Sequence, residues 1–211
     1  MCSTVLAVAA CAAPSSPPMD AASSPQPSSQ VNPARIDRVR EELPSDYETA
    51  ELSGPVSPAV LWGYGTAWSA DPPQCAALAD PVGAATAAGW SASGPGGIVH
   101  AAVAASRGAV DSAVLAECQQ WTIVGGRTAG RVTRVPAPAL AQATAVALVT
   151  TSTTVVEGGT ETRSKSDTVT AYLGEHVAFV SVVTDPGSPT PQLGSDFASD
   201  LIVKTVSALR G

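Results

Sequence analysis

The chain has 211 residues, of which 45% are hydrophobic, so one globular domain with a substantial core fits within it. Only 14% of the residues are charged, and the 18 acidic residues outnumber the 11 basic ones, which gives a net charge of −7. No run of Lys and Arg is present to displace counterions from phosphates, so the composition argues against a nucleic-acid partner.

A short apolar run near the N-terminus ends directly at a cysteine. Residues 5–10 read VLAVAA and are followed by Cys11. A bacterial lipoprotein signal ends in this way, because its peptidase requires small residues before the cut and the new N-terminal cysteine then receives the lipid. We therefore predict a signal peptide over residues 1–10 and lipidation of Cys11. No Lys or Arg precedes this cysteine, so we expect the natural start to lie upstream of Met1; the alternative is an Ala-rich cytosolic N-terminus.

A tract rich in Ser and Pro follows the cysteine. Residues 12–33 contain almost nothing that could be buried, so they cannot repay the entropy of ordering and should form a disordered tether. The alternative, a proline-rich ligand for a partner groove, lacks the basic residue that such ligands usually carry. We therefore divide the chain into a signal peptide (1–10), a lipidated cysteine with its tether (11–33) and one globular domain (34–211). The domain is expected at the extracytoplasmic face of the cell membrane.

The cysteines support export. If Cys2 leaves with the signal and Cys11 carries lipid, Cys75 and Cys118 remain as one pair. An even remainder in an oxidising compartment predicts a disulfide, which would stabilise the fold by roughly 4 kcal/mol. Two buried free thiols are the alternative.

Neither a metal site nor a cofactor is expected. Zinc sites use closely spaced Cys or His pairs, whereas His100 and His176 stand apart from each other and from the cysteines.

The first half of the domain mixes short helices with extended segments. Asn32 and Pro33 are typical of a helix start, and Pro44 ends the helix that follows. The further elements that we expect here are an extended piece around Tyr47, a helix from Ser57-Pro58, a helical turn over 75–79, a strand over 98–104 and a helix capped by Asp111 that reaches Cys118.

The second half predicts a sheet. Four segments rich in Val and Thr are bounded by Gly, Pro and Asp: 131–135, 146–156, 168–173 and 177–183. Gly158-Gly159 lies between the second and the third, which predicts a long hairpin with a polar tip. A final amphipathic helix starts near Ser195. The fold class is therefore α+β, with helices packed mainly on one face of an antiparallel sheet.

Catalytic motifs are incomplete. Residues 89–93 (GWSAS) approach the Gly-x-Ser-x-Gly turn that exposes a nucleophile, but position 93 is Ser. That turn also requires a parallel sheet and a downstream histidine, for which His176 is the available residue. We therefore expect a protein that is not an enzyme, with a serine hydrolase based on Ser91 as the remote alternative.

Aromatic residues are few but grouped. Trp62, Tyr64 and Trp68 lie within seven residues, and Gly63 and Gly65 stand between them. The rings could border a cleft, or they could fill the gap between helices and sheet, which is the more common role of large aromatic side chains.

The order of these features resembles a known group of proteins. A lipobox with a Ser/Pro tether, the segments DPPQCAALADP and AVLAECQQWT, a Val/Thr-rich sheet and a last helix ending in LRG are similar to uncharacterised mycobacterial cell-envelope lipoproteins. More distantly, the segment 44–211 resembles the extracellular sensor domain of PknH-type kinases, which is α+β with a cleft and is presumed to bind a ligand. The second disulfide of those domains has no counterpart here.

The resemblance implies a membrane-anchored lipoprotein that binds a lipid, a glycan or an envelope protein and catalyses nothing. A structural or protein-interaction role without a ligand cavity is the alternative.

Overall fold

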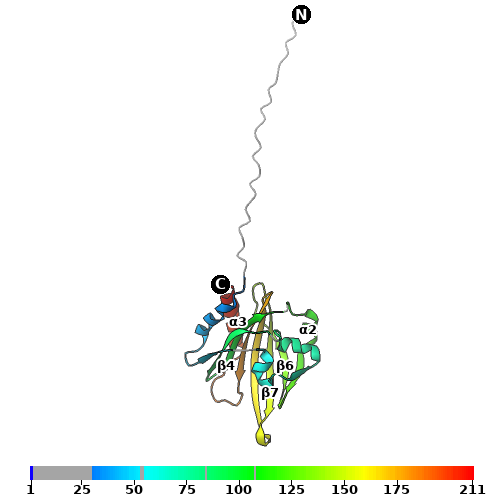
Figure 1. Cartoon of the computed structure of the whole chain (residues 1–211), viewed down its shortest axis with the longest axis vertical. Helices are drawn as coiled ribbons and strands as arrows, with labels where there is room; N and C mark the ends of the chain where they lie inside the picture. Colours follow the sequence, from blue (N-terminus) through cyan, green and yellow to red (C-terminus); the bar gives the residue numbers. More distant parts are fainter. Residues whose placement is uncertain (2–29, 53–54, 84, 107) are drawn as a thin grey trace.

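A computed structural model describes Met1 and residues 30–211 apart from 53–54, 84 and 107 (Figure 1). The expected signal peptide, Cys11 and most of the tether lie outside the described residues. Within the described residues, no helix is long and apolar enough to cross a membrane.

One antiparallel sheet of nine strands forms the centre of the domain, in the order β1-β3-β4-β9-β8-β7-β6-β5-β2. Neighbouring strands pair antiparallel throughout. The strands are β1 (Glu48–Glu51), β2 (Trp68–Asp71), β3 (Ala88–Gly94), β4 (Gly97–Ala105), β5 (Gln120–Gly125), β6 (Thr128–Val135), β7 (Thr144–Val155), β8 (Glu161–Tyr172) and β9 (His176–Thr184). The α+β class and the antiparallel sheet are confirmed, and β7, β8 and β9 follow one another as an antiparallel meander.

The long hairpin β7–β8 has a shorter tip than the sequence predicts. Its turn is confined to η4 (Glu157–Gly159), where Gly158 has a φ of 80°. Strand β8 starts at Glu161 rather than at 168, because its polar residues stay paired with the threonines of β7. Ser166 and Asp167 are consequently buried, and Lys165 neutralises the Asp167 carboxylate at 2.7 Å.

Three strands were not expected: β2, β3 and β5. Two of them, β2 and β3, consist largely of Ala, Gly, Ser and Asp around one Trp each, so their intrinsic strand propensity is low. The pairing of β2 with β5 and of β3 with β4 supplies the hydrogen bonds that their own sequences do not favour.

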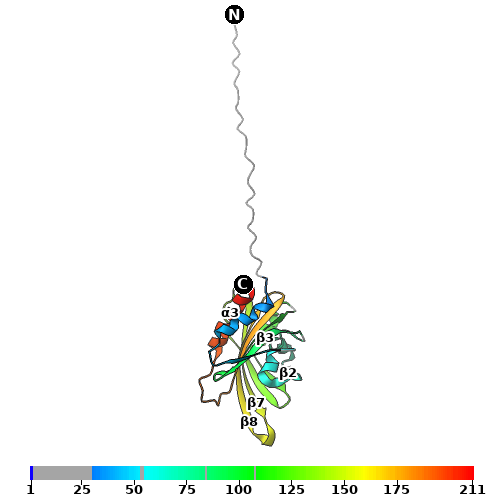
Figure 2. The same cartoon turned by 60° about the vertical axis from the view of Figure 1, so that its left-hand side comes forward.

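The helices α3 (Ser195–Arg210) and η1 (Pro33–Glu42) cover one face of the sheet (Figure 2). Asn32 caps η1 as predicted, by accepting a hydrogen bond from the backbone N–H of Ala34 at 3.1 Å, although the segment is a 3-10 helix. Ile36 and Ile202 belong to the core on this face. The buried Trp90 donates from Nε1 to the Ile36 carbonyl at 3.1 Å and so fastens η1 to β3.

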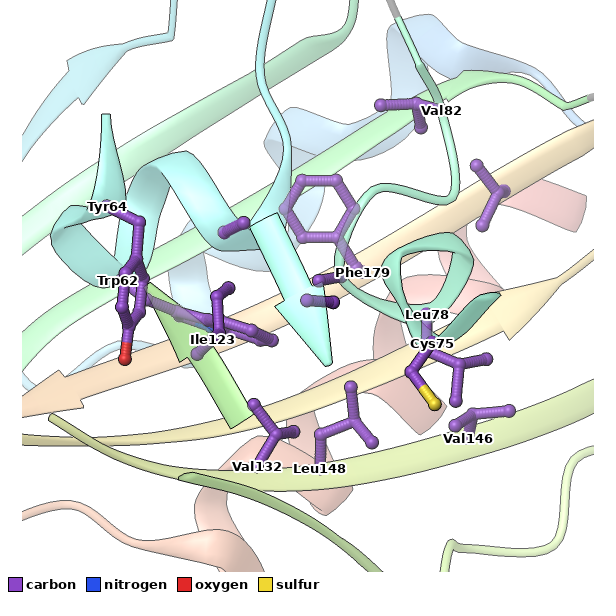
Figure 3. Close-up of a cluster of buried hydrophobic side chains, with 14 of the residues drawn as sticks. Trp62, Tyr64, Cys75, Leu78, Val82, Ile123, Val132, Val146, Leu148 and Phe179 are labelled. Atoms are coloured by element: carbon purple, nitrogen blue, oxygen red, sulfur yellow. The ribbon is translucent and has the colours of Figure 1, made fainter. Parts of the chain in front are cut away.

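Short helical segments cover the other face. They are η2 (Val60–Tyr64), η3 (Pro73–Cys75), α1 (Ala76–Ala79) and α2 (Ser112–Glu117). Their apolar side chains form a second core cluster with the strands, centred on Trp62, Leu78 and Phe179 (Figure 3). Helices therefore lie on both faces, with the longest one, α3, opposite the short ones.

Candidate functional site

Two of the three grouped aromatic residues lie inside the core beneath η2. Trp62 is 2% exposed and Tyr64 is 3% exposed. The Trp62 indole donates from Nε1 to Thr168 Oγ1 at 2.9 Å, and Thr168 in turn bonds to the hydroxyl of Ser181 at 2.7 Å. Gly63, between the two aromatics, has a φ of 95° and is required by the backbone of this turn. These two rings join η2 to the sheet and border no open cleft.

Glycines in the sheet make room for Tyr64. A Cβ on Gly130 would overlap the Tyr64 hydroxyl, and a Cβ on Gly125 would overlap the Tyr64 carbonyl oxygen. Because both glycines lack side chains, the Tyr64 backbone packs closely on β5 and its hydroxyl on β6, with the ring beside Ile123 (Figure 3). The packing of η2 therefore depends on two glycines of strands that follow it in the chain.

Trp68, the third aromatic residue, borders a hollow on this same face of the sheet. It lies in β2 opposite Gly125 of β5 and is half-buried. The hollow has a volume of about 670 Å³. Its described lining comes from β2, α1, α2, the end of β8 and the loops beside them: Thr66, Trp68, Ala76, Ala77, Asp80, Pro81, Gly83, Ser106, Gly108, Ala109, Val110, Asp111, Val114 and Tyr172.

The polar side chains that line the hollow include a phenol, two carboxylates and the hydroxyls of Thr66 and Ser106. Burial raises the pKa of Tyr172 to about 12, so its hydroxyl keeps its proton at neutral pH and can donate a hydrogen bond. Asp111 accepts from the backbone N–H of Ala113 at 2.8 Å, and Asp80 accepts from that of Gly83 at 2.9 Å. Each carboxylate is thus oriented by one bond through Oδ1. No Lys, Arg or His is among the described residues that line the hollow.

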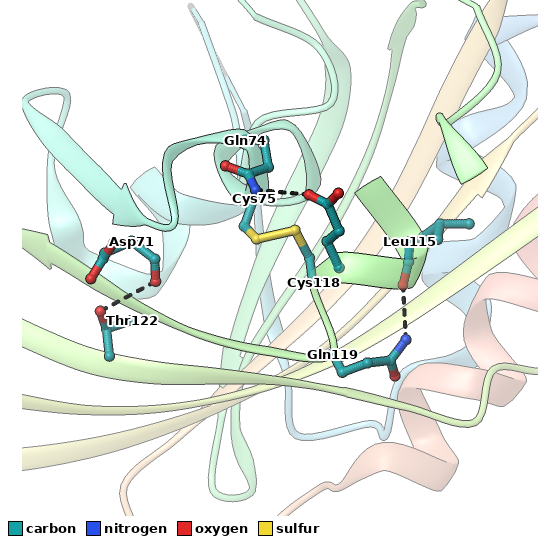
Figure 4. The surroundings of a disulfide bond; sticks show 8 residues. Asp71, Gln74, Cys75, Leu115, Cys118, Gln119 and Thr122 are labelled. Carbon is teal, nitrogen blue, oxygen red and sulfur yellow. Dashed lines mark hydrogen bonds between the residues drawn. A yellow bond between two sulfur atoms is a disulfide. The ribbon is translucent and has the colours of Figure 1, made fainter. Parts of the chain in front are cut away.

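The predicted disulfide holds the walls of this hollow together. Cys75 and Cys118 are bonded, with their Cα atoms 5.6 Å apart, and both are fully buried (Figure 4). Cys75 immediately precedes α1 and Cys118 ends α2, the two helices that contribute lining residues. Beside the disulfide, Gln74 Nε2 donates to Glu117 Oε2 at 2.8 Å. None of the residues of α2 itself is fully buried, but Val114 and Leu115 pack half-buried against the core, and the disulfide adds a covalent attachment at the end of the helix.

The fold does not bring Ser91 and His176 together. Ser91 is opposite His100 in the β3–β4 register, whereas His176 is opposite Ala105. Five residues of extended strand separate these positions, or about 16 Å, which is beyond hydrogen-bond reach. His100 is buried, and burial lowers its pKa to about 4. In the described part of the chain, no three His, Cys, Asp or Glu side chains gather as a metal site would require.

Six of the described lining residues have polar or aromatic side chains, and the sequence singled out only Trp68 of these as bordering a cleft. Trp68 was recognised because it stands in an aromatic group. Asp111 was recognised only as a helix cap, and Asp80 and Tyr172 carried no signal, since a lone acid after a helix and a Tyr in a strand are common.

The fold of this chain is shared with a solved structure. The chain is similar to the X-ray structure of an uncharacterized protein from Mycobacterium smegmatis, the Rv0999 ortholog, with a TM-score of 0.62 and 17% identity over 86% of this chain and 98% of the other. At this identity the likeness shows a shared fold. No curated protein is similar to the chain in sequence. Residues 32–210 match the family described as domain of unknown function DUF5642. The chain therefore belongs to the DUF5642 family.

Proposed function

We propose that this protein is an exported, lipid-anchored module of the cell envelope that binds a small ligand without catalysing a reaction. The observation that carries the proposal is the hollow beside Trp68, which combines an accessible indole with oriented polar groups. The disulfide supports export, because such bonds persist in oxidising compartments. The run VLAVAAC supports the anchor, and the resemblance to kinase sensor domains supports binding rather than catalysis.

The lining favours a neutral ligand that has both an apolar face and several hydroxyl groups. An indole such as that of Trp68 stacks on the C–H face of a sugar ring, and binding pockets generally combine aromatic walls with a few placed polar groups. The carboxylates of Asp80 and Asp111 accept from hydroxyls, and the Tyr172 hydroxyl donates to a ring or glycosidic oxygen. The described lining places two carboxylates in the hollow and no cation beside them, which disfavours a phosphorylated ligand. A glycan is therefore the ligand class that this site fits best.

The test is calorimetric titration of the full chain with trehalose, maltotriose and tri-N-acetylglucosamine, and with palmitate as an apolar probe. Saturable binding of a sugar is expected, and Trp68→Ala should weaken it by about tenfold or more, since aromatic contacts in a pocket contribute on this scale. Ile98→Ala is the matched control, because Ile98 is 41% exposed and lies outside the hollow.

Two results would count against the proposal. Binding of palmitate alone would leave a ligand module but replace the glycan with a lipid. If no probe binds and Trp68→Ala changes nothing, the second candidate, an envelope protein with a structural or protein-interaction role, becomes the better account.

A further inference from the structure

Part of the face that α3 covers remains open towards the β7–β8 hairpin. Thr151 and Thr153 of β7 point to the same face as Ala147, which packs in the core beneath α3. Beyond the N-terminal end of α3, the outward side chains of β5 to β8 form a groove of about 560 Å³. Its lining includes Thr122, Arg131, Thr151, Thr153, Arg163 and Pro186.

The charge of this groove differs in sign from that of the protein. Arg131 and Arg163 are the charged residues among its described lining, whereas the whole chain carries a net charge of −7. Asp71, Glu161 and Asp167 point to the same side of the sheet, and Asp185 precedes the lining residue Pro186, but none of these carboxylates lines the groove. An exposed pair of arginines without a carboxylate between them creates a local positive potential that attracts anions.

The strand register lets both arginines reach one bound group. Arg131 of β6 is opposite Thr151, and Arg163 of β8 is opposite Thr153, so the two arginines flank β7 on either side. Two strand spacings and a two-residue offset place their Cα atoms roughly 12 Å apart. Two arginine side chains can span that interval and converge on a small group above the two threonine hydroxyls.

Arg131 is oriented without being neutralised. Its Nη1 donates to Gln120 Oε1 at 2.8 Å, and Gln120 Nε2 donates to Thr133 Oγ1 at 3.2 Å. Arg163 forms no ion pair with any described residue. Lys165, the nearest other cation on β8, is instead paired with Asp167 at 2.7 Å. The two guanidinium groups therefore keep their charge available.

We propose that this groove binds a phosphate group, held between Arg131 and Arg163 with help from the hydroxyls of Thr151 and Thr153. A planar guanidinium donates to two oxygens of an oxyanion, so one arginine engages both oxygens of a carboxylate. A phosphate monoester has three terminal oxygens and can therefore accept from two arginines. The groove lies on the opposite face of the sheet from the hollow beside Trp68, so the two sites can be occupied together.

Phosphate groups from more than one source would fit this groove. Strands β7 and β8 place the groove towards the end of the domain that lies opposite the C-terminus (Figure 1). Free phosphate, a phosphorylated sugar and a lipid headgroup share the same chemistry, and the experiment separates them.

The test follows the amide signals of Thr151 and Thr153 by NMR while the full chain is titrated. The probes are inorganic phosphate, glucose 6-phosphate, acetate, and phosphatidylcholine vesicles with and without phosphatidic acid. Saturable shifts at these amides are expected with phosphate-bearing probes. Arg131→Gln and Arg163→Gln should each weaken binding by about tenfold or more, because each removes charge-assisted hydrogen bonds. Arg131→Lys should recover only part of this loss, since an ammonium cannot form the bidentate contact.

Arg127→Gln is the matched control. Arg127 is an exposed arginine in the turn between β5 and β6, outside the groove, and its loss removes the same charge. A change of less than about twofold is expected, because solvent and salt screen a charge at that distance. Equal weakening by Arg127→Gln and Arg131→Gln would overturn the site in favour of bulk charge. Acetate binding as tightly as phosphate, or an absence of saturable shifts, would also overturn it. Stronger binding of glucose 6-phosphate, or of vesicles that contain phosphatidic acid, would support the site and identify the source.

Discussion

The phenolic oxygen of Tyr64 lies 2.7 Å from the Oγ atom of Ser152, and this bond joins η2 to β7 across 88 residues of sequence. Both side chains are buried, so neither can exchange its partner for water. The bond positions the aromatic segment over the sheet and thereby places the start of β2, with Trp68, at the edge of the hollow.

Substitutions of Tyr64 should lower stability in two steps. Tyr64→Phe leaves the Ser152 hydroxyl buried and unpaired, which should lower the free energy of unfolding by about 1–2 kcal/mol. Tyr64→Ala also removes the ring and should cost roughly 3–5 kcal/mol. Urea denaturation followed by Trp fluorescence measures both values. A change close to zero for Tyr64→Ala would mean that the ring is not part of the core.

Gly130→Ala should destabilise the domain although it adds a single methyl group. The new Cβ would overlap the Tyr64 hydroxyl and lie 2.6 Å from the Thr151 carbonyl oxygen, so both η2 and β7 would have to move. We expect a loss of about 1–3 kcal/mol or more, as for other overpacked cores. Gly194→Ala is the control, because an added Cβ there meets nothing within 4 Å. Similar thermal midpoints for the two variants would contradict this packing.

Removal of the disulfide should lower stability substantially. Cys75 and Cys118 are separated by 43 positions, so the double variant Cys75→Ala/Cys118→Ala should lose roughly 4 kcal/mol through the greater entropy of its unfolded chain. Dithiothreitol should lower the melting temperature of the wild type and leave that of the double variant unchanged. Two thiols that react with an alkylating reagent in the folded, exported protein would contradict the bond.

His100 should make stability depend on pH. Burial lowers its pKa from 6.5 to about 4, and its neighbours across β3 and β9 are the uncharged Ser91 and Ser181. Between pH 6.5 and about 4 the unfolded chain binds more protons at this histidine than the folded one. The free energy of unfolding is therefore unaffected by His100 above pH 6.5 and falls as the pH is lowered from 6.5 to about 4. The total loss should be roughly 3 kcal/mol. Urea titrations at several pH values give the free energy of unfolding as a function of pH, and this free energy should depend less on pH in His100→Gln than in the wild type. An equal pH dependence in both proteins would refute the assignment.

Lipidation of Cys11 is tested by cell fractionation. Cys11→Ala, expressed with the native upstream sequence, should move the protein from the membrane to the soluble fraction, because a single cysteine carries the proposed anchor. Cys2→Ala is the control and should not change the distribution. A Cys11→Ala protein that stays in the membrane fraction, unprocessed like the wild type, would show that the anchor lies elsewhere.

Local chemistry determined those parts of the fold that the sequence predicted. Helix α3 follows from its amphipathic spacing, α2 from the Asp111 cap, and β7 to β9 from their Val and Thr runs, since each pattern lies within one segment. The pairing of Cys75 with Cys118 followed from counting the cysteines. The sequence did not predict the short strand β3, because its residues are weak strand formers and become a strand only when β4 pairs with them.

The roles of individual side chains were decided by the tertiary structure. Trp62 and Trp68 look alike in sequence, yet one is buried and the other borders the hollow, because the turn between them crosses from η2 to the sheet edge. Likewise, Arg131 and Arg163 are separated by a whole hairpin and share a groove only through the register of β6, β7 and β8. The sequence pattern of a helix or strand determines on which face of that element each residue lies. Which residues of different segments meet is set by strand pairing and by where the glycines allow close approach.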